Sequence, residues 1–186
     1  MNILVINNYS KHINELSNLL KNHNVTIVEN DKFDGSINKD INLIILTGGH
    51  RKSIMRHQEE FKNELDIIKK TGKPIIGICL GAEMIAYTYG GKMKKMLFKK
   101  KGYYSVTSTQ QKNNLITKNK VITVFEAHRW TIKELPSSFE VYAVSKDGIE
   151  IFKHAKKAIY GLQFHPEVNT IHNDGQLVFQ KILQEI

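Results

Sequence analysis

The sequence predicts an α/β fold with a mostly parallel central sheet, helices on both faces of that sheet, and a smaller antiparallel portion. In the first half of the chain, short β-branched apolar runs alternate with segments in which apolar residues recur at helical spacing. This alternation is typical of a parallel sheet covered on both faces. Later in the chain, Tyr103–Thr109 alternates polar and apolar residues, as an antiparallel strand does. The length of 186 residues suits one domain with one sizeable core, so we expect residues 1–186 to form a single domain.

The expected elements of the parallel part follow one another in a regular order. The predicted strands are Asn2–Asn7, Val25–Val28, Ile41–Leu46 and the run that begins at Ile75. The predicted helices are Ser10–His23, Glu59–Lys70, Glu83–Tyr89 and, at the end of the chain, Leu177–Ile186. Ligands of such sheets bind at the carboxyl ends of the strands, so residues that directly follow a strand are candidates for a site.

The antiparallel part is expected to contain Tyr103–Thr109 and Val121–Phe125, joined by a polar hairpin loop over Gln110–Lys120. Two last strands, Ile149–Lys153 and Ala158–Phe164, are expected to pair through a turn at Lys156 and Lys157.

Composition places the chain among ordinary globular proteins, with 41% hydrophobic and 24% charged residues. A single cysteine excludes an internal disulfide framework and fits a reducing cytosol. We find no signal peptide and no apolar run near the roughly 20 residues of a membrane span, so a cytoplasmic location without membrane contact is expected.

The net charge of +9 favours an anionic partner. The run Lys92–Lys101 contains six lysines and no acidic residue. It lacks the interleaved aromatic residues of nucleic-acid modules, so nucleic-acid binding is not expected. A solvated edge is the simplest interpretation, and a docking surface for an acidic partner or a site that attracts an anionic nucleotide are the alternatives.

The most informative stretch surrounds Cys79. Gly77 and Gly81 flank it at two positions on either side, between an apolar strand and a helical pattern, which suits a sharp strand-to-helix turn. Such a turn presents the central side chain at a helix N-terminus, where a lowered thiol pKa and a nucleophilic thiolate are expected. The alternative is that Cys79 is a small core residue.

A second stretch, Gln163-Phe164-His165-Pro166-Glu167, supplies what a cysteine nucleophile needs. His165 is a candidate base for the Cys79 thiol, and Glu167 is a candidate to fix the orientation of the imidazole. The pairing requires the fold to bring two strand ends together.

These two stretches, with Leu46-Thr47-Gly48-Gly49, resemble the class I, triad-type glutamine amidotransferases over nearly the whole chain. The resemblance implies that Cys79, His165 and Glu167 hydrolyse the side-chain amide of glutamine through a γ-glutamyl thioester. It implies that amides of Gly48 or Gly49 and of Leu80 stabilise the oxyanion. No cofactor is implied and no metal cluster is evident. Many relatives have proline where this chain has His50, which implies a different loop shape.

The segment Ala127-His128-Arg129-Trp130, before Leu135-Pro136, resembles the GMP synthetase type of amidotransferase, in which it helps to bind glutamine. Ala127 replaces the serine typical of that type and Trp130 replaces an aspartate. Glu83 stands where many relatives carry a glutamine that contacts the substrate. A carboxylate there suits either the ammonium group of free glutamine or a different γ-glutamyl ligand.

No ATP-pyrophosphatase domain or P-loop occurs in the chain, so any ATP-dependent synthetase must be a separate subunit. Two other functions remain open at this point. One is a γ-glutamyl hydrolase that acts on γ-glutamyl amides or peptides without an ammonia acceptor, and the other is a non-catalytic regulatory homologue.

Overall fold

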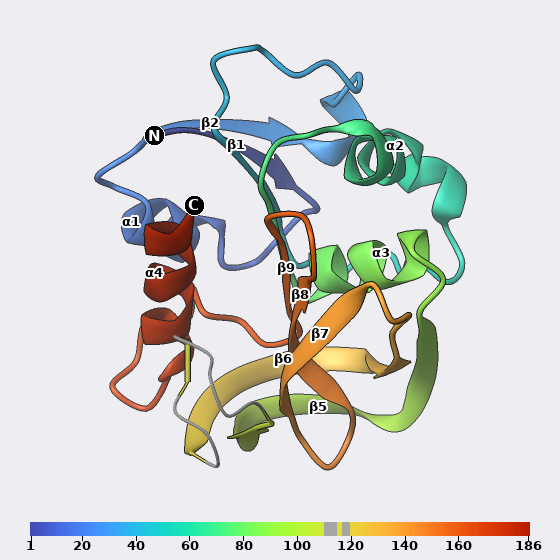
Figure 1. The fold of residues 1–186 in the computed structure, drawn as a ribbon, viewed down its shortest axis with the longest axis vertical. Helices are drawn as coiled ribbons and strands as arrows, with labels where there is room; N and C mark the ends of the chain where they lie inside the picture. The colour runs from blue at the N-terminus through green and yellow to red at the C-terminus, as the bar shows by residue number, and fades with distance from the viewer. Residues whose placement is uncertain (110–114, 117–119) are drawn as a thin grey trace.

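The computed structural model describes residues 1–109, 115–116 and 120–186, which form a nine-stranded sheet, a small barrel and four α-helices (Figure 1). The strand order is β2-β1-β3-β4-β9-β8-β6-β5-β7. Most of the expected hairpin loop Gln110–Lys120 lies outside the described residues.

Five strands form the parallel part. In sheet order they are β2 (Asn24–Glu29), β1 (Asn2–Asn7), β3 (Leu43–Leu46), β4 (Ile75–Ile78) and β9 (Ile159–Leu162). Their carboxyl ends meet at one edge of the sheet. The stretches that carry Asn8, Thr47, Cys79 and Gln163 leave the strands at that edge, and this places the candidate site there.

The antiparallel part comprises β5 (Lys92–Ser108), β6 (Val121–Glu134), β7 (Phe139–Val144) and β8 (Ile149–His154). β5 pairs with β6, β6 with β8, β8 with β7 and β7 with β5, so these four strands close into a small barrel (Figure 1). β8 also pairs with β9 and joins the barrel to the parallel part.

The expectation of a smaller antiparallel portion is wrong, because β5 has 17 residues and β6 has 14. β5 begins at Lys92, inside the lysine run, and β6 continues to Glu134, well past the expected end at Phe125. Lysine-rich sequence has weak β-propensity, and here cross-strand pairing overrides it. No strand was expected over Phe139–Val144, which pairs with β8.

Four helices surround the sheet: α1 (Ile13–Leu19), α2 (Lys62–Lys70), α3 (Leu80–Thr88) and α4 (Gly175–Glu185). α1 is shorter than the expected Ser10–His23, and a short 3-10 turn, Gln58–Phe61, precedes α2 where the helix was expected to begin. None of the helices in the described ranges is long and apolar enough to cross a membrane.

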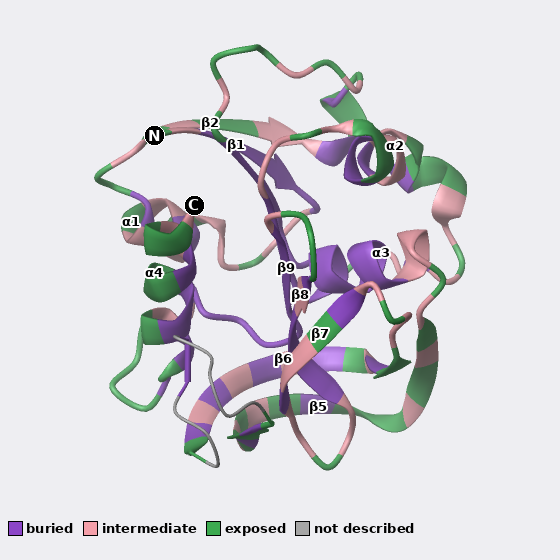
Figure 2. Ribbon diagram, viewed as in Figure 1, coloured by how far each residue is buried: buried purple, intermediate pink, exposed green. Residues whose placement is uncertain are grey.

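The core consists of two clusters of buried residues. Ile3 and Val5 of β1 belong to one cluster, together with residues of α1 and α4. Leu4 and Ile6 belong to the other, together with residues of α2 and α3. Successive residues of the strand thus enter different clusters, and both the sheet and α3 are largely buried (Figure 2).

Candidate active site

The turn between β4 and α3 carries Cys79. Its backbone has φ 50° and ψ −103°, one of two positive φ values at non-glycine residues in the described part of the chain. A Cβ on Gly81 would lie 2.2 Å from the Leu46 carbonyl oxygen, and one on Gly77 would lie 2.5 Å from the Gly81 backbone. Only glycine fits at these two positions, so the flanking glycines make the sharp turn possible. The Cys79 amide donates to the Leu162 carbonyl at 2.7 Å and ties the turn to β9.

His165 follows β9 and is held from both sides of its backbone. Its amide donates to the Phe125 carbonyl at 2.8 Å, and Asn173 Nδ2 donates to the His165 carbonyl at 2.8 Å. The ring Nδ1 lies 2.8 Å from Oε1 of Glu167, whose side chain is buried. The buried carboxylate therefore fixes the orientation of the imidazole and its Nδ1–H tautomer.

The structure brings Cys79 and His165 into hydrogen-bonding contact. Gly48 packs against both, since a Cβ there would lie 2.8 Å from His165 Cε1 and 3.4 Å from Cys79 Cβ. The two motifs are 86 positions apart in sequence, and the parallel pairing of β4 with β9 places them side by side.

The charge balance of this pair differs from the expectation. Burial raises the pKa of the Cys79 thiol, and contact with His165 only partly opposes it. The predicted lowering of this pKa is therefore wrong, because the thiol is enclosed and loses its hydration. Burial alone would lower the pKa of His165, but the charges of Glu167 and Cys79 hold it well above its usual value. The site thus places a strongly basic imidazole beside a thiol that needs a base.

The glycine loop after β3 lies against the same turn. A Cβ on Gly49 would lie 2.6 Å from the Asn8 carbonyl oxygen and 2.7 Å from Leu80 Cδ2. His50 Nδ1 lies 2.7 Å from the carbonyl oxygen of Tyr9, to which it donates a hydrogen bond. The residue that replaces the proline of many relatives therefore anchors this loop to the loop after β1.

A cavity of about 310 Å³ opens above Cys79. It is lined by all the residues that the sequence analysis placed at the substrate, with part of the oxyanion loop: Gly49, Leu80, Glu83, Ala127, His128, Arg129 and Trp130. Its remaining wall is mainly cationic and was not foreseen: Arg51, Lys52, Arg56, His57, Lys95 and Lys99, with His50 and Ser53. Such a rim favours an anionic group at the mouth of the cavity.

Glu83 is buried in the wall of this cavity and accepts a hydrogen bond from Gln163 Nε2 at 3.2 Å. Burial raises the pKa of its carboxyl group to about 8, and the hydrogen bond from Gln163 and the charge of His165 oppose this only partly. The sequence analysis treated Glu83 as a carboxylate, whereas the structure makes it a neutral carboxylic acid at neutral pH. Gln163 was not recognised as its partner, although it begins the stretch that contains His165.

His128 lines the cavity, but both ring nitrogens are already engaged. Nδ1 lies 2.6 Å from the Trp130 carbonyl oxygen, and Nε2 lies 2.7 Å from Glu126 Oε2. Its role is therefore to fix the shape of β6 beside the cavity, and its ring nitrogens are not available to a substrate.

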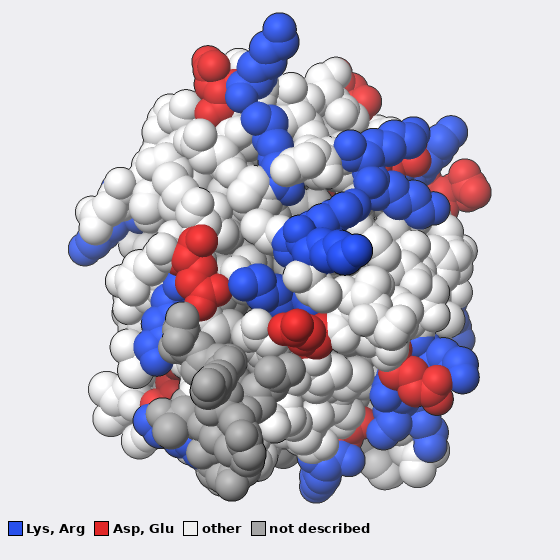
Figure 3. Space-filling view, viewed as in Figure 1, with Lys and Arg blue, Asp and Glu red and all other residues white. Residues whose placement is uncertain are grey.

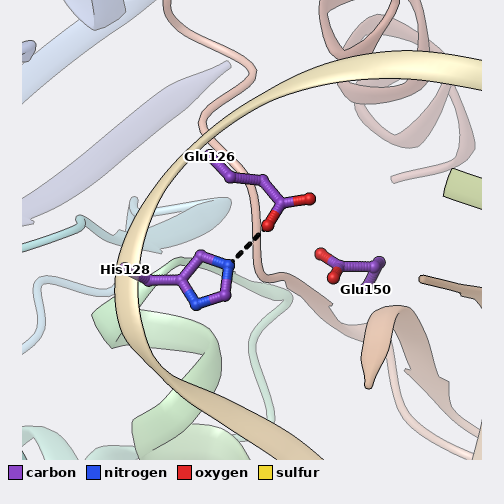
Figure 4. Close-up of side chains that lie close together, drawn as sticks. All are labelled: Glu126, His128 and Glu150. Carbon is purple, nitrogen blue, oxygen red and sulfur yellow. Dashed lines mark hydrogen bonds and ion pairs between the residues drawn. The ribbon is translucent and has the colours of Figure 1, made fainter. Parts of the chain in front are cut away.

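Glu126, His128 and Glu150 converge inside the barrel, with candidate ligand atoms within 4.8 Å of one another (Figure 4). No sequence pattern indicates this group, because residues on β6 and β8 meet only when the barrel closes. The Lys100 ammonium lies 2.6 Å from Glu126 Oε2 and 2.8 Å from Asp147 Oδ2, and already supplies a cation to these acids. Burial and the charge of Glu126 raise the pKa of Glu150 to about 8, which removes a further negative charge near neutral pH. We therefore interpret the group as an ion-pair network in the barrel interior.

The lysine run is not uniformly a solvated edge. Lys100 is buried in the barrel, and Lys92 pairs with Glu134 at 2.7 Å. Elsewhere on the surface, cations are interspersed with acidic side chains, as one face shows (Figure 3). Only the four other lysines of the run remain candidates for contact with a partner.

The chain resembles known proteins over almost its whole length. Residues 4–185 match the family model described as glutamine amidotransferase class-I. The chain is 34% identical over 185 residues to the glutamine-hydrolysing subunit of GMP synthase from Methanococcus vannielii, with 96% of this chain and 93% of that protein covered. It is also 34% identical to the protein of the same name from Methanosphaera stadtmanae, with 99% of each covered. A crystal structure described as that of a GMP synthase subunit from Thermoplasma acidophilum superposes with a TM-score of 0.85 at 28% identity, over 99% of this chain and 92% of that one.

Proposed function

This chain belongs to the class I glutamine amidotransferase family, and on that premise we propose that it is the glutaminase subunit of a two-subunit GMP synthase. It hydrolyses glutamine and supplies ammonia to a separate ATP-dependent synthetase subunit. The observation that carries the proposal is the contact of Cys79 with His165, and of His165 with Glu167, at the floor of a cavity. The relatives at 34% identity over more than nine-tenths of the chain, named as glutamine-hydrolysing subunits, support the same assignment.

In the proposed mechanism, Cys79, His165 and Glu167 act as a triad. His165 takes the thiol proton, and the thiolate attacks the side-chain carbonyl carbon of glutamine. His165 then gives that proton to the departing nitrogen, which leaves as ammonia, and a γ-glutamyl thioester remains on Cys79. A water molecule, deprotonated by His165, attacks the thioester, and glutamate leaves as the thiolate re-forms.

We assign the oxyanion-stabilising role to backbone amides of the glycine loop, at Gly48 or Gly49, and to the Leu80 amide. The close packing of Gly48 against both reacting side chains supports this assignment, as does the position of Leu80 at the start of α3. Donors of this kind contribute about 3–4 kcal/mol each to transition-state stabilisation. The mechanism uses side chains and backbone amides only, without a cofactor.

We also infer that the parallel part is a sheet covered by helices on both faces. The division of successive β1 residues between a cluster with α1 and α4 and one with α2 and α3 supports this inference.

The proposal is tested by ammonia release from the purified protein with glutamine, with γ-glutamyl peptides and with other γ-glutamyl amides. We expect glutamine to be preferred by at least about tenfold in kcat/KM, because a pocket of this size suits one amino acid. The names of the relatives favour glutamine over the γ-glutamyl hydrolase alternative. A preference for γ-glutamyl peptides would establish that alternative. Absence of turnover with every substrate, with or without a synthetase subunit, would support a non-catalytic role.

The pH dependence should show how Glu83 acts. A buried carboxyl group with a pKa of about 8 is protonated below pH 8 and ionised above it. Its negative charge would then face the α-carboxylate of bound glutamine, so KM should rise as the pH increases through 8. Glu83→Gln keeps the shape and the hydrogen-bonding capacity and cannot ionise. We therefore expect KM within about threefold of the wild type at pH 7 and a weaker rise above pH 8.

The matched control is Glu59→Gln, an exposed carboxylate that should leave the profile unchanged. A large rise in KM for Glu83→Gln at pH 7 would instead mean that Glu83 is ionised there and binds the ammonium group of glutamine. A gain for free glutamine relative to a γ-glutamyl amide would mean that Glu83 selects a larger compound.

A further inference from the structure

The most exposed apolar side chains beside the active site lie on a bulge of β5. Lys95 pairs with Trp130, and the next paired residue of β5 is Lys100, opposite His128. Four residues of β5, Met96–Lys99, therefore stand opposite Arg129 alone, and we call them the β5 bulge. Such an insertion bends a strand and turns its side chains outward.

At the tip of the β5 bulge, Leu97 is 86% exposed and Phe98 is 84% exposed. An exposed pair of this size on a monomer is unusual when it is held in place, and this one is held. Arg129 Nη2 donates to the Leu97 carbonyl at 3.2 Å, and Lys100, directly after the bulge, is fixed in the barrel by Glu126 and Asp147. A fixed, exposed apolar tip marks a contact site for another protein.

The surroundings of the tip are cationic. Within the described residues, Lys94, Lys95 and Lys99 form no ion pair. Lys95 and Lys99 face the cavity above Cys79, together with Arg129. A partner that covers the tip must therefore place acidic side chains around an apolar socket.

The position of the β5 bulge also fixes where such a partner sits. Lys99 lines the cavity above Cys79, and it also lines a second cavity of about 150 Å³ that reaches His165. His12 forms part of the wall of that second cavity, with its ring 5.5 Å from the ring of His165. A protein seated on the bulge thus lies over both openings to the reacting side chains, which is where a recipient of ammonia has to be.

We propose that Leu97 and Phe98 anchor the ATP-dependent synthetase subunit, through an apolar socket ringed by acidic side chains. Lys95 and Lys99 would steer the two subunits together. This inference rests on the proposed function, and it assigns the docking role to the tip of the bulge and not to the lysine run as a whole. Lys92 and Lys100 belong to the fold.

The test is the affinity of this protein for the GMP synthetase subunit of the same organism, measured by calorimetry. For Leu97→Asp/Phe98→Asp we expect Kd to rise at least about tenfold. Lys95→Glu/Lys99→Glu should also weaken binding, and the wild-type Kd should increase with salt. Leu177→Asp, on the exposed face of α4, is the matched control and should bind like the wild type. A milder pair, Leu97→Ser/Phe98→Ser, guards against loss of folding, checked by the melting temperature.

Two readouts separate this inference from the proposed function. Glutamine hydrolysis by the isolated protein reports on the triad, and we expect it to stay within about twofold of the wild type in Leu97→Asp/Phe98→Asp. Absence of hydrolysis in the wild type, alone or with the synthetase, would contradict the proposed function while Kd still tested the docking site. Wild-type Kd in both Leu97/Phe98 double variants, or no binding of the synthetase by the wild type, would overturn the inference.

Discussion

Cys79→Ala should lower glutamine hydrolysis by about 10⁴-fold or more, because the reaction then has no nucleophile to form the thioester. Cys79 is the only cysteine of the chain, so no other thiol can replace it. Ammonia release from glutamine measures the effect. An electrophilic ketone analogue of glutamine should label the wild type at one site, found by mass spectrometry at Cys79, and should leave the variant unlabelled.

The fold should survive this substitution, since one small buried side chain becomes smaller and the backbone at φ 50° is unchanged in its demand on a Cβ residue. The control is the complex of Cys79→Ala with the synthetase subunit. It should make product from added ammonium salt at the wild-type rate and none from glutamine. Turnover of glutamine by the variant at more than about one-hundredth of the wild-type rate would exclude Cys79 as the nucleophile.

The parts of the site that depend on local sequence could be predicted. The glycines around Cys79 impose a turn whatever the rest of the chain does, since any Cβ at Gly81 would collide with the β3 backbone. The order of strands and helices then brings the end of β9 beside that turn. Both predictions rest on geometry that a short stretch of chain already contains. The family resemblance is confirmed by the match over residues 4–185.

The parts that depend on long-range packing could not be predicted. Lys100 looks like its neighbours in a lysine-rich run, and only the closure of the barrel gives it Glu126 and Asp147 as partners. The neutral state of Glu83 and the raised pKa of the Cys79 thiol both result from burial by segments distant in sequence. The anchoring of His50 by the carbonyl of Tyr9 likewise joins two loops that no local pattern connects.

Glu167→Gln should lower kcat by about 10³–10⁴-fold with little change in KM, because Glu167 acts on His165 and does not line the cavity above Cys79. The Glu167 carboxylate accepts from Nδ1 of His165 and helps to raise the pKa of that imidazole. An amide can present its NH₂ group to Nδ1 and so favour the wrong tautomer. It also carries no charge to stabilise the imidazolium that forms when the thiol is deprotonated.

The rate at which Cys79 is alkylated, followed against pH, tests this reasoning apart from turnover. Without the charge of Glu167 the pKa of His165 falls, so less imidazolium is present at a given pH to stabilise the thiolate. The rise of the alkylation rate should therefore move to higher pH in Glu167→Gln, whereas a purely structural role would leave its position unchanged. Glu140→Gln, an exposed carboxylate, should match the wild type in both measurements. A kcat within about threefold of the wild type in Glu167→Gln would remove Glu167 from the triad, and His165 would then have to be oriented by its backbone contacts alone.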